Sequence, residues 1–169
     1  ELSHSEPANN EIEELILGGE GEKVEFKSTL RFDLRANAVN KKLEYVIAKT
    51  IAAFLNSEGG DLLIGVDDNQ NALGLEKDFE TLSKKNIDGF GLRLVEVIKK
   101  YIGGGYSSHI KITFPDYDET KICQVKVARS GKPVFTTFEE REDFFIRSGC
   151  SSQPLSREDQ SIYEKEHWG

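Results

Sequence analysis

Apolar residues recur along the chain at two different spacings, and these spacings separate predicted helices from predicted strands. In residues 37–57 they return every three or four positions, which predicts an amphipathic helix with one buried face. These positions are Val39, Leu43, Val46, Ile47, Ile51 and Phe54. In residues 121–128 apolar and polar residues alternate, which predicts a strand with two different faces.

The same criteria predict further elements on both sides of these two. Helices are expected at residues 10–17, 88–101 and 156–167, and strands at 23–28, 62–66, 72–75, 108–114, 134–137 and 143–147. Gly59-Gly60 is expected to end the long helix, because glycine readily adopts the left-handed conformation after a helix. We predict an α+β fold in which a mixed, mostly antiparallel sheet is packed by three to four helices.

Length and composition indicate which residues are expected to form a folded domain and in which cellular compartment the protein is expected. The 169 residues suit one domain, which we assign to residues 10–169, after a polar lead-in over residues 1–9 that we expect to be disordered. The sequence shows no signal peptide and no apolar run long enough for a bilayer, so we expect a cytoplasmic location without membrane contact. Because the sequence begins with Glu1 and contains no Met, we expect it to be a segment of a longer protein.

The net charge of −8 argues against a protein that binds phosphate groups over its whole surface. Positive side chains are concentrated in residues 20–49 and 84–111, so any contact with nucleic acid is expected to be local. The candidate contact residues are Lys23, Arg31, Arg35, Lys41, Lys42 and Arg147. Arg147 precedes several serines, which suits phosphate binding, and the alternative is an ion pair with a carboxylate.

Three carboxylates are candidate ligands for a metal ion. Glu20 and Glu25 lie at the start of the first predicted strand, and Asp67 follows the strand at 62–66. Carboxylate oxygens are the ligands that Mg²⁺ and Mn²⁺ prefer, and such an ion can activate water. On a regular strand Glu20 and Glu25 would face opposite sides, so they converge only if Glu20 lies in a turn. The alternative is that all three are solvated surface groups.

The tripeptide Glu25-Phe26-Lys27 places a carboxylate and an amine on one face of a strand. This arrangement is found in restriction-type nucleases, where the lysine assists the attacking water, and it makes Lys27 a further catalytic candidate. It is also common on exposed strands without any function. A phosphate-binding loop of the Gly-x-x-x-x-Gly-Lys-Ser/Thr type does not occur in the sequence, so ATP is not an expected ligand.

Several segments together resemble the Schlafen/AlbA-type domain, a family common in bacteria. The matching segments are Glu20–Lys27, Ile51–Gly60, Leu63–Asp68, Leu73–Leu75, Phe145–Gly149 and Ser152–Leu155. The resemblance implies a domain that binds DNA or RNA. Animal relatives are endoribonucleases with three acidic residues, which correspond here to Glu20, Glu25 and Asp67. Those relatives contain two copies of the unit, so the single copy here implies a homodimer.

Three functions follow from these observations as alternatives. The first is a metal-dependent endoribonuclease that uses the three carboxylates and Lys27. The second is a non-catalytic DNA- or RNA-binding module of a bacterial regulator or defence protein. The third is a protein-interaction domain, which the net negative charge favours.

Overall fold

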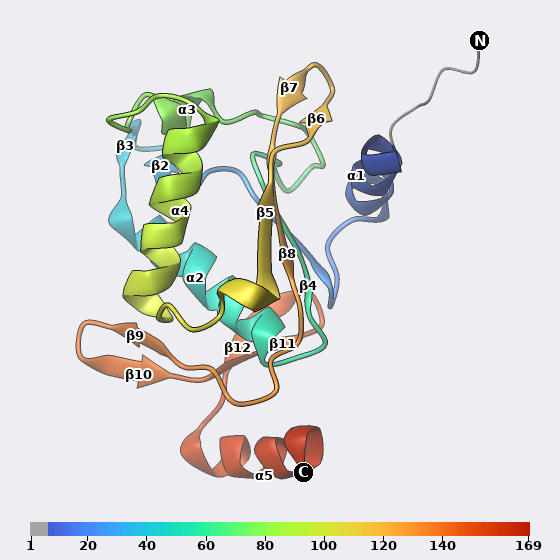
Figure 1. Cartoon of the computed structure of the whole chain (residues 1–169), viewed down its shortest axis with the longest axis vertical. Helices are drawn as coiled ribbons and strands as arrows, with labels where there is room; N and C mark the ends of the chain where they lie inside the picture. Colours follow the sequence, from blue (N-terminus) through green and yellow to red (C-terminus); the bar gives the residue numbers. More distant parts are fainter. Residues whose placement is uncertain (1–6) are drawn as a thin grey trace.

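The computed structural model describes residues 7–169, and the expected lead-in over residues 1–6 lies outside this part. The chain contains five α-helices and a central sheet in the described part (Figure 1). The helices are α1 (Pro7–Gly18), α2 (Lys41–Leu55), α3 (Glu76–Phe79), α4 (Ile87–Tyr101) and α5 (Arg157–Trp168). Residues 7–9, which we assigned to the lead-in, belong to α1. None of the described helices has the length and hydropathy needed to cross a membrane.

The central sheet has four strands in the order β1–β4–β8–β5. These strands are β1 (Val24–Lys27), β4 (Gly60–Ile64), β8 (Cys123–Val127) and β5 (Ile110–Thr113). Only the β1–β4 pair is parallel, and the other two pairs are antiparallel. The predicted α+β class and the mostly antiparallel sheet are therefore confirmed.

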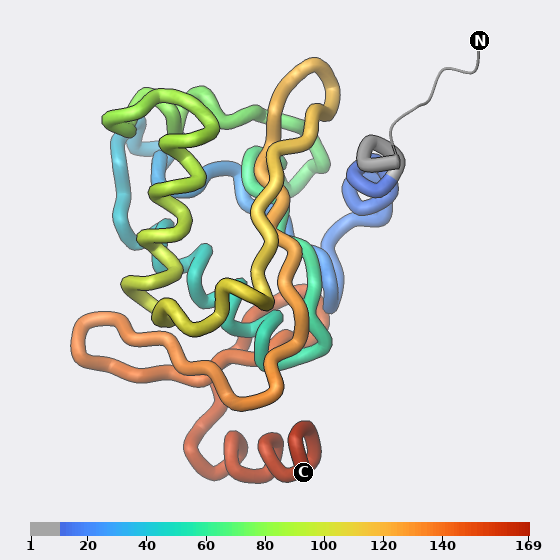
Figure 2. Tube along the Cα trace, in the orientation of Figure 1, coloured from blue at the N-terminus to red at the C-terminus, as the bar shows by residue number. Residues whose placement is uncertain are grey.

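Four two-stranded ribbons surround this sheet. They are β2 (Phe32–Asp33) with β3 (Ala38–Val39), β6 (Asp116–Tyr117) with β7 (Thr120–Lys121), β9 (Thr136–Phe138) with β10 (Arg141–Asp143), and β11 (Phe145–Ser148) with β12 (Ser151–Pro154). A short 3-10 turn (Ser107–His109) precedes β5. The ribbon at β6–β7 and helix α5 lie at opposite ends of the molecule (Figure 2).

Helices cover both faces of the sheet, and each face has its own apolar cluster. The larger cluster joins α2 and α4 to one face, and its fully buried members include Ile51, Phe54, Phe90, Leu62 and Val125. The smaller cluster joins α1 to the opposite face through Ile12, Ile16, Phe26, Leu63 and Ile122. Burial on both sides explains why β4 has an apolar run rather than a strict alternation.

Helix α2 begins four residues later than the sequence predicted. Val39 pairs with Phe32 in a small ribbon, and Asn37 has a positive φ of 52°, which is incompatible with a helix. Asn40 is the N-cap, because its side chain accepts the N–H of Lys42 at 3.0 Å. Val39 is an apolar strand residue that happens to fit the helical spacing, and for this reason the predicted helix began too early.

The connection from α2 to β4 depends on two glycines. Gly59 and Gly60 have φ values of 77° and 158°, in the region that favours glycine. A Cβ atom on Gly60 would lie 2.5 Å from the Phe54 ring and 2.7 Å from the carbonyl oxygen of Lys23. The pair therefore allows β4 to pass close to both α2 and β1, as the sequence pattern predicted for a helix end.

Candidate nucleic-acid interface

Strand β1 is an edge strand, and its alternation directs Glu25 and Lys27 to the face of the sheet that α2 covers. Glu25 is opposite Leu62, and Lys27 is opposite Ile64, and both of these partners belong to the large apolar cluster. Glu25 is buried, whereas the Lys27 side chain remains 30% exposed. The two side chains form an ion pair, with Lys27 Nζ 3.1 Å from Glu25 Oε1.

Arg147 closes the inner side of this pair. Its side chain is 1% exposed, and its Nη2 lies 3.5 Å from Glu25 Oε2. Its guanidinium also donates to the carbonyl oxygens of Gly21 (2.6 Å) and Glu22 (3.3 Å), and its carbon atom Cζ lies 4.8 Å from the centre of the Phe54 ring. These contacts fasten the start of β1 to β11. The structure therefore shows the alternative that the sequence left open, an ion pair between Arg147 and a carboxylate, and these partners leave the guanidinium little capacity for a phosphate.

Glu20 lies in a bend just before β1, as its convergence with Glu25 required. The N–H of Gly21 donates to the carbonyl oxygen of Val24, and Glu20 Oε1 accepts the N–H of Phe26 at 3.0 Å. Burial raises the pKa of Glu20 above its ordinary value, and the nearby carboxylates of Glu25 and Asp68 raise it further. The N–H of Phe26 opposes this rise.

Asp67 is occupied by its own turn rather than by Glu20 and Glu25. Its Oδ1 accepts the N–H groups of Asn69 and Asn71, both at 2.9 Å, and its Oδ2 accepts the side-chain amide of Asn71 at 3.2 Å. Burial acts to raise the pKa of Asp67, but these hydrogen bonds outweigh it and lower the pKa. The charged neighbour of Glu20 from this turn is Asp68 rather than Asp67.

The predicted metal site at Glu20, Glu25 and Asp67 is not assembled. Within residues 7–169 no three His, Cys, Asp or Glu side chains are grouped closely enough to hold a metal ion. Glu20 accepts a backbone N–H, and Glu25 forms ion pairs with two cations. As these side chains stand, they do not fit Mg²⁺ or Mn²⁺.

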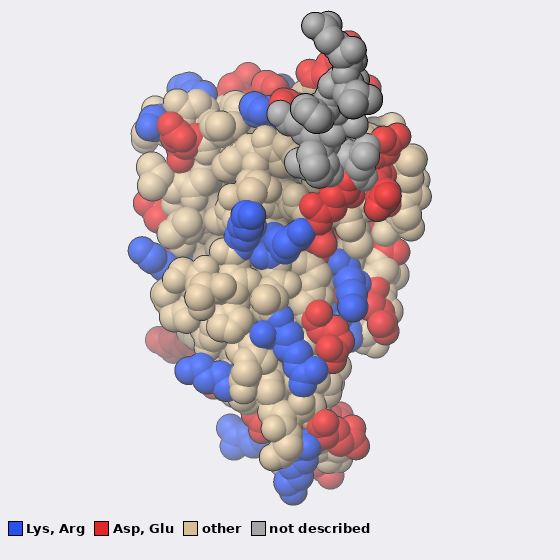
Figure 3. All heavy atoms as spheres, turned by 45° about the vertical axis from the view of Figure 1, so that its right-hand side comes forward, with Lys and Arg blue, Asp and Glu red and all other residues tan. Residues whose placement is uncertain are grey.

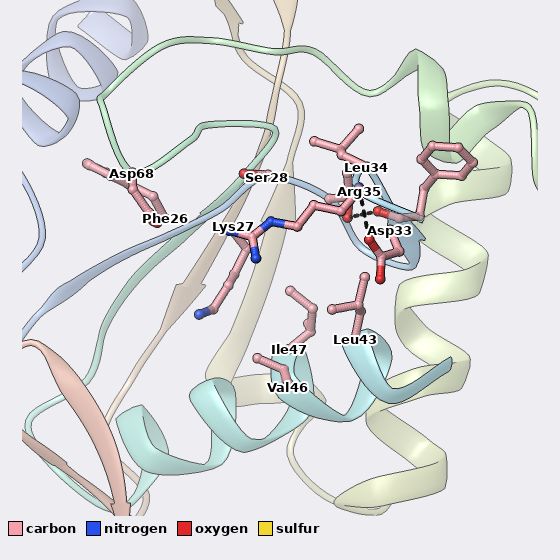
Figure 4. A pocket seen from close by; sticks show the side chains of 12 residues that line it. Phe26, Lys27, Ser28, Asp33, Leu34, Arg35, Leu43, Val46, Ile47 and Asp68 are labelled. Atoms are coloured by element: carbon pink, nitrogen blue, oxygen red, sulfur yellow. Dashed lines mark hydrogen bonds between the residues drawn. The ribbon is translucent and has the colours of Figure 1, made fainter. Parts of the chain in front are cut away.

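An open cavity of about 400 Å³ lies next to Lys27, between the end of β1, the β2–β3 ribbon and α2. We call it the first cavity; it is lined by polar residues of 27–35, by Asp68 and by the apolar side chains of Leu43, Val46 and Ile47. Figure 4 shows that Lys27 and Arg35 both extend into it. Asp33 fixes the loop by accepting the N–H groups of Arg35 and Ala36 at 3.0 Å.

Arg35 is the exposed cation of this cavity. Within residues 7–169 it forms no ion pair with a carboxylate, in contrast to Lys27. A guanidinium with free N–H donors suits a phosphate group, which accepts two of them at once. The apolar wall formed by α2 lies opposite, so the first cavity can contact both a charged group and a flat apolar one.

The other residues predicted to contact nucleic acid differ in how exposed their side chains are. Lys41 and Lys42 are exposed at the start of α2, and Lys23 is exposed before β1. The Arg31 side chain is only 13% exposed and points toward buried Glu44, with Nε 3.8 Å from a carboxylate oxygen. Arg31 is therefore a structural residue, and its predicted contact with nucleic acid is not supported.

The charged surface is mixed rather than uniformly basic. On the face shown in Figure 3, Lys and Arg occur in small groups separated by Asp and Glu. A phosphate backbone would meet repulsion over much of this face, so only local contacts remain favourable. This distribution agrees with the local binding that the net charge predicted.

Comparison with known proteins gives a family and a fold. The model of the family described as Schlafen, AlbA_2 matches residues 20–156. The DIP2311 protein of Corynebacterium diphtheriae has a similar structure, with a TM-score of 0.61 and 18% identity, over 88% of this chain and 28% of that one. The N-terminal domain of a RecG-related protein from Nitrosomonas europaea is similar with a TM-score of 0.55 and 18% identity, over 89% of this chain and 94% of that domain. No curated protein matched the sequence.

Proposed function

Because the chain belongs to the Schlafen AlbA_2 family, we propose that it is a nucleic-acid-binding domain whose first cavity takes a backbone phosphate of RNA or DNA. The observation that supports this most directly is the pair of cations, Lys27 and Arg35, that extend into an open cavity with one apolar wall. Phosphate contacts of this kind position a nucleic acid without reading its sequence.

The test is a binding titration of fluorescein-labelled RNA and DNA, followed by anisotropy at several salt concentrations. We expect Arg35→Ala to weaken binding about three- to tenfold and to reduce the salt dependence of the affinity, because one phosphate contact is lost. Arg157→Ala is the matched control: Arg157 is also exposed, but it begins α5 at the far end of the molecule. Absence of binding by the unmodified protein at low salt would contradict the proposal.

A metal-dependent endoribonuclease is the second candidate function. One feature favours it: the carboxylates of Glu25 and Asp68 both raise the pKa of Glu20 at the edge of the sheet, and a cation bound there would relieve the repulsion on Glu20. In this proposal Asp68, rather than the predicted Asp67, is the third carboxylate. Since the carboxylates do not form a metal site as they stand, we derive no cleavage step from them.

Cleavage is tested by incubating structured RNA with the protein and either Mg²⁺ or Mn²⁺. If the carboxylates act on the substrate, Glu20→Gln and Asp68→Asn should abolish cleavage, whereas Asp67→Asn should leave it intact. Equal cleavage by the unmodified protein and Glu20→Gln would exclude this function. Binding without any cleavage would leave the non-catalytic proposal as it is.

We also propose that the chain acts as a homodimer, because the family relatives with two copies of the unit suggest that one copy forms half of a binding groove. Sedimentation velocity over a range of protein concentrations, with and without RNA, tests this. A monomer that binds RNA with a one-to-one stoichiometry would contradict it.

A further inference from the structure

A second cavity, of about 440 Å³, lies between the start of α2, the end of α4 and the β9–β10 ribbon. We call it the lysine cavity, because Lys41, Lys42 and Lys100 line it together with Tyr101, Phe138 and Glu139. Figure 1 shows the β9–β10 ribbon projecting from the body of the molecule beside the end of α4. The lysines thus converge from two helices that are far apart in the sequence.

The three lysines give the lysine cavity a local excess of positive charge. All three are exposed, and within residues 7–169 none forms an ion pair with a carboxylate. Lys100 lies over the ring of Tyr101, with Nζ 5.1 Å from the ring centre. Among residues 7–169, Glu139 is the one carboxylate that lines the cavity. The first turn of α2 adds partial positive charge at the same place.

The aromatic side of the lysine cavity is held rigidly. Phe138 is partly exposed and stacks on Tyr45, with ring centres 4.5 Å apart and an angle of 21° between the rings. Tyr45 is fixed in turn by its hydroxyl, 3.1 Å from Thr136 Oγ1, and by an edge contact with Tyr101 at 5.4 Å. A fixed aromatic ring beside unpaired lysines is the combination that binds a base and its neighbouring phosphates in single-stranded nucleic acid.

The two cavities lie on adjoining sides of one helix end. Leu43 lines the first cavity, and the preceding residue, Lys42, lines the lysine cavity. Consecutive residues of an α-helix are separated by about 100° around the axis and about 1.5 Å along it. A chain of nucleotides bound in the first cavity would therefore meet the lysine cavity if it continued over the start of α2.

We propose that the lysine cavity binds a second segment of the same strand, with phosphates at Lys41, Lys42 and Lys100 and a base stacked on Phe138. This inference rests on the proposed function and makes it more specific, because a stacked base requires an unpaired strand. The preferred substrate is then single-stranded RNA or DNA rather than a duplex.

The test compares two neighbouring lysines of α4 in the full chain, with a labelled oligouridylate of about 12 nucleotides. Lys99 is exposed like Lys100, but it lines a different, apolar cavity. We expect Lys100→Glu to weaken binding about fivefold or more and to lower the salt slope by about 0.7, whereas Lys99→Glu has a smaller effect on both. Equal effects of the two reversals would overturn the inference.

Two further variants test the stacked base and the rim carboxylate. Phe138→Leu should weaken binding of the single strand about five- to tenfold without changing the salt slope, because stacking involves no ion release. Glu139→Gln should tighten binding. Cooperative thermal unfolding of Phe138→Leu checks that the ribbon remains folded, and an unchanged affinity of this folded variant would contradict the stacked base.

The outcomes separate this inference from the proposed function. If Arg35→Ala weakens binding while Lys100→Glu and Lys99→Glu behave alike, the first cavity binds nucleic acid and the lysine cavity does not. A duplex of the same sequence that binds as tightly as the single strand would also contradict the inference. If the unmodified protein binds no oligonucleotide at low salt, both proposals fail.

Discussion

The cluster around Arg147 and the lysine cavity contain side chains of the same charge, but their surroundings are opposite. Arg147 is 1% exposed, faces Glu25 and donates to two backbone carbonyl groups. Lys41, Lys42 and Lys100 are exposed around an open cavity with one carboxylate at its rim. The difference teaches that a basic residue of this acidic protein stabilises the fold when it is buried with a carboxylate and is available to a ligand when it stays exposed; Lys27, which pairs with Glu25 but is 30% exposed, lies between these two cases.

Removal of Arg147 should have the largest effect on stability. Arg147→Met leaves Glu25 buried with one cation fewer and the carbonyl groups of Gly21 and Glu22 without their donor, so we expect a loss of about 3–5 kcal/mol in the free energy of unfolding. Urea denaturation measures it. Arg35→Met, at an exposed position, should change the free energy by less than about 0.5 kcal/mol. A loss at Arg147 as small as this would remove the distinction between the two classes of cation.

Glu44 provides the next test, because it is a buried carboxylate held by two arginines. Its oxygens accept Arg93 Nε at 2.5 Å and Nη2 at 2.8 Å, and Arg31 Nε lies 3.8 Å away. Glu44→Gln should cost about 1–3 kcal/mol, since one charged acceptor is lost in a buried place. The control is Glu96→Gln, which removes the exposed partner of the same Arg93. Similar losses in urea denaturation for both variants would show that burial does not decide the contribution.

Two exposed lysines test whether exposure alone makes a basic residue available to nucleic acid. Lys42 lines the lysine cavity, whereas Lys23 is exposed but lines neither cavity. Lys42→Ala should weaken oligonucleotide binding about threefold and leave stability unchanged. Lys23→Ala should change neither binding nor stability, although the sequence predicted a contact there, because Lys23 lines neither cavity. Anisotropy titrations at two salt concentrations, together with thermal unfolding, distinguish these results. A larger effect at Lys23 would place the bound strand elsewhere.

Asp61 gives the smallest expected effect on stability. It is a carboxylate that is neither fully buried nor exposed. It is half-buried beside α1, and its Oδ1 accepts the side-chain amide of Gln124 at 2.9 Å. Burial raises its pKa above the ordinary 3.8, against the opposing effects of Gln124 and Lys126. The folded state therefore binds a proton more tightly here than the unfolded state does, and this contribution to stability falls as the pH rises from 3.8 through the folded pKa.

Asp61→Asn should therefore raise the free energy of unfolding near neutral pH by less than about 1 kcal/mol, while keeping the hydrogen bond from Gln124. The gain should disappear below the ordinary pKa of 3.8, where the aspartate is protonated in both states. Urea denaturation at the two pH values measures it, with exposed Asp116→Asn as the control. A loss of stability near neutral pH would mean that Lys126 outweighs burial.

Much of the fold followed from the periodicity of apolar residues, because long elements repeat the same signal several times. Helices α1, α2, α4 and α5 and all four strands of the central sheet lie within the predicted ranges or within a few residues of them. The short elements α3, β2, β3, β6 and β12 were missed, since two to four residues contain too few repeats for a period. The short strands are stabilised by hydrogen bonds to neighbouring strands, and these hydrogen bonds form only in the tertiary structure.

The candidate site was predicted only in part. The position of Glu20 in a bend was inferred correctly, but the hydrogen bonds that hold Asp67 in its own turn, and the place of Asp68 beside Glu20, were not predicted. A signal against Asp67 was present: an aspartate that begins a turn commonly accepts the N–H two residues later, which predicts that Asp67 caps its own turn. Arg147 lies two residues after the buried Phe145 on the same strand. Residues two apart on a strand face the same side, so an inward side chain was predictable for Arg147. The identity of its partner, Glu25, could not be read from the sequence because they are 122 residues apart.

The parallel pairing of β1 with β4 has a consequence for the order of folding. Parallel neighbours cannot be joined by a tight hairpin, so the chain must pass through the β2–β3 ribbon and α2 before β4 can take its place beside β1. Closing such a long loop costs entropy before any contact compensates it, and it slows the formation of the native topology. The antiparallel strands β8 and β5 are separated by much less chain. During refolding, protection of backbone amides from hydrogen exchange should therefore appear in β5 and β8 before it appears in β1.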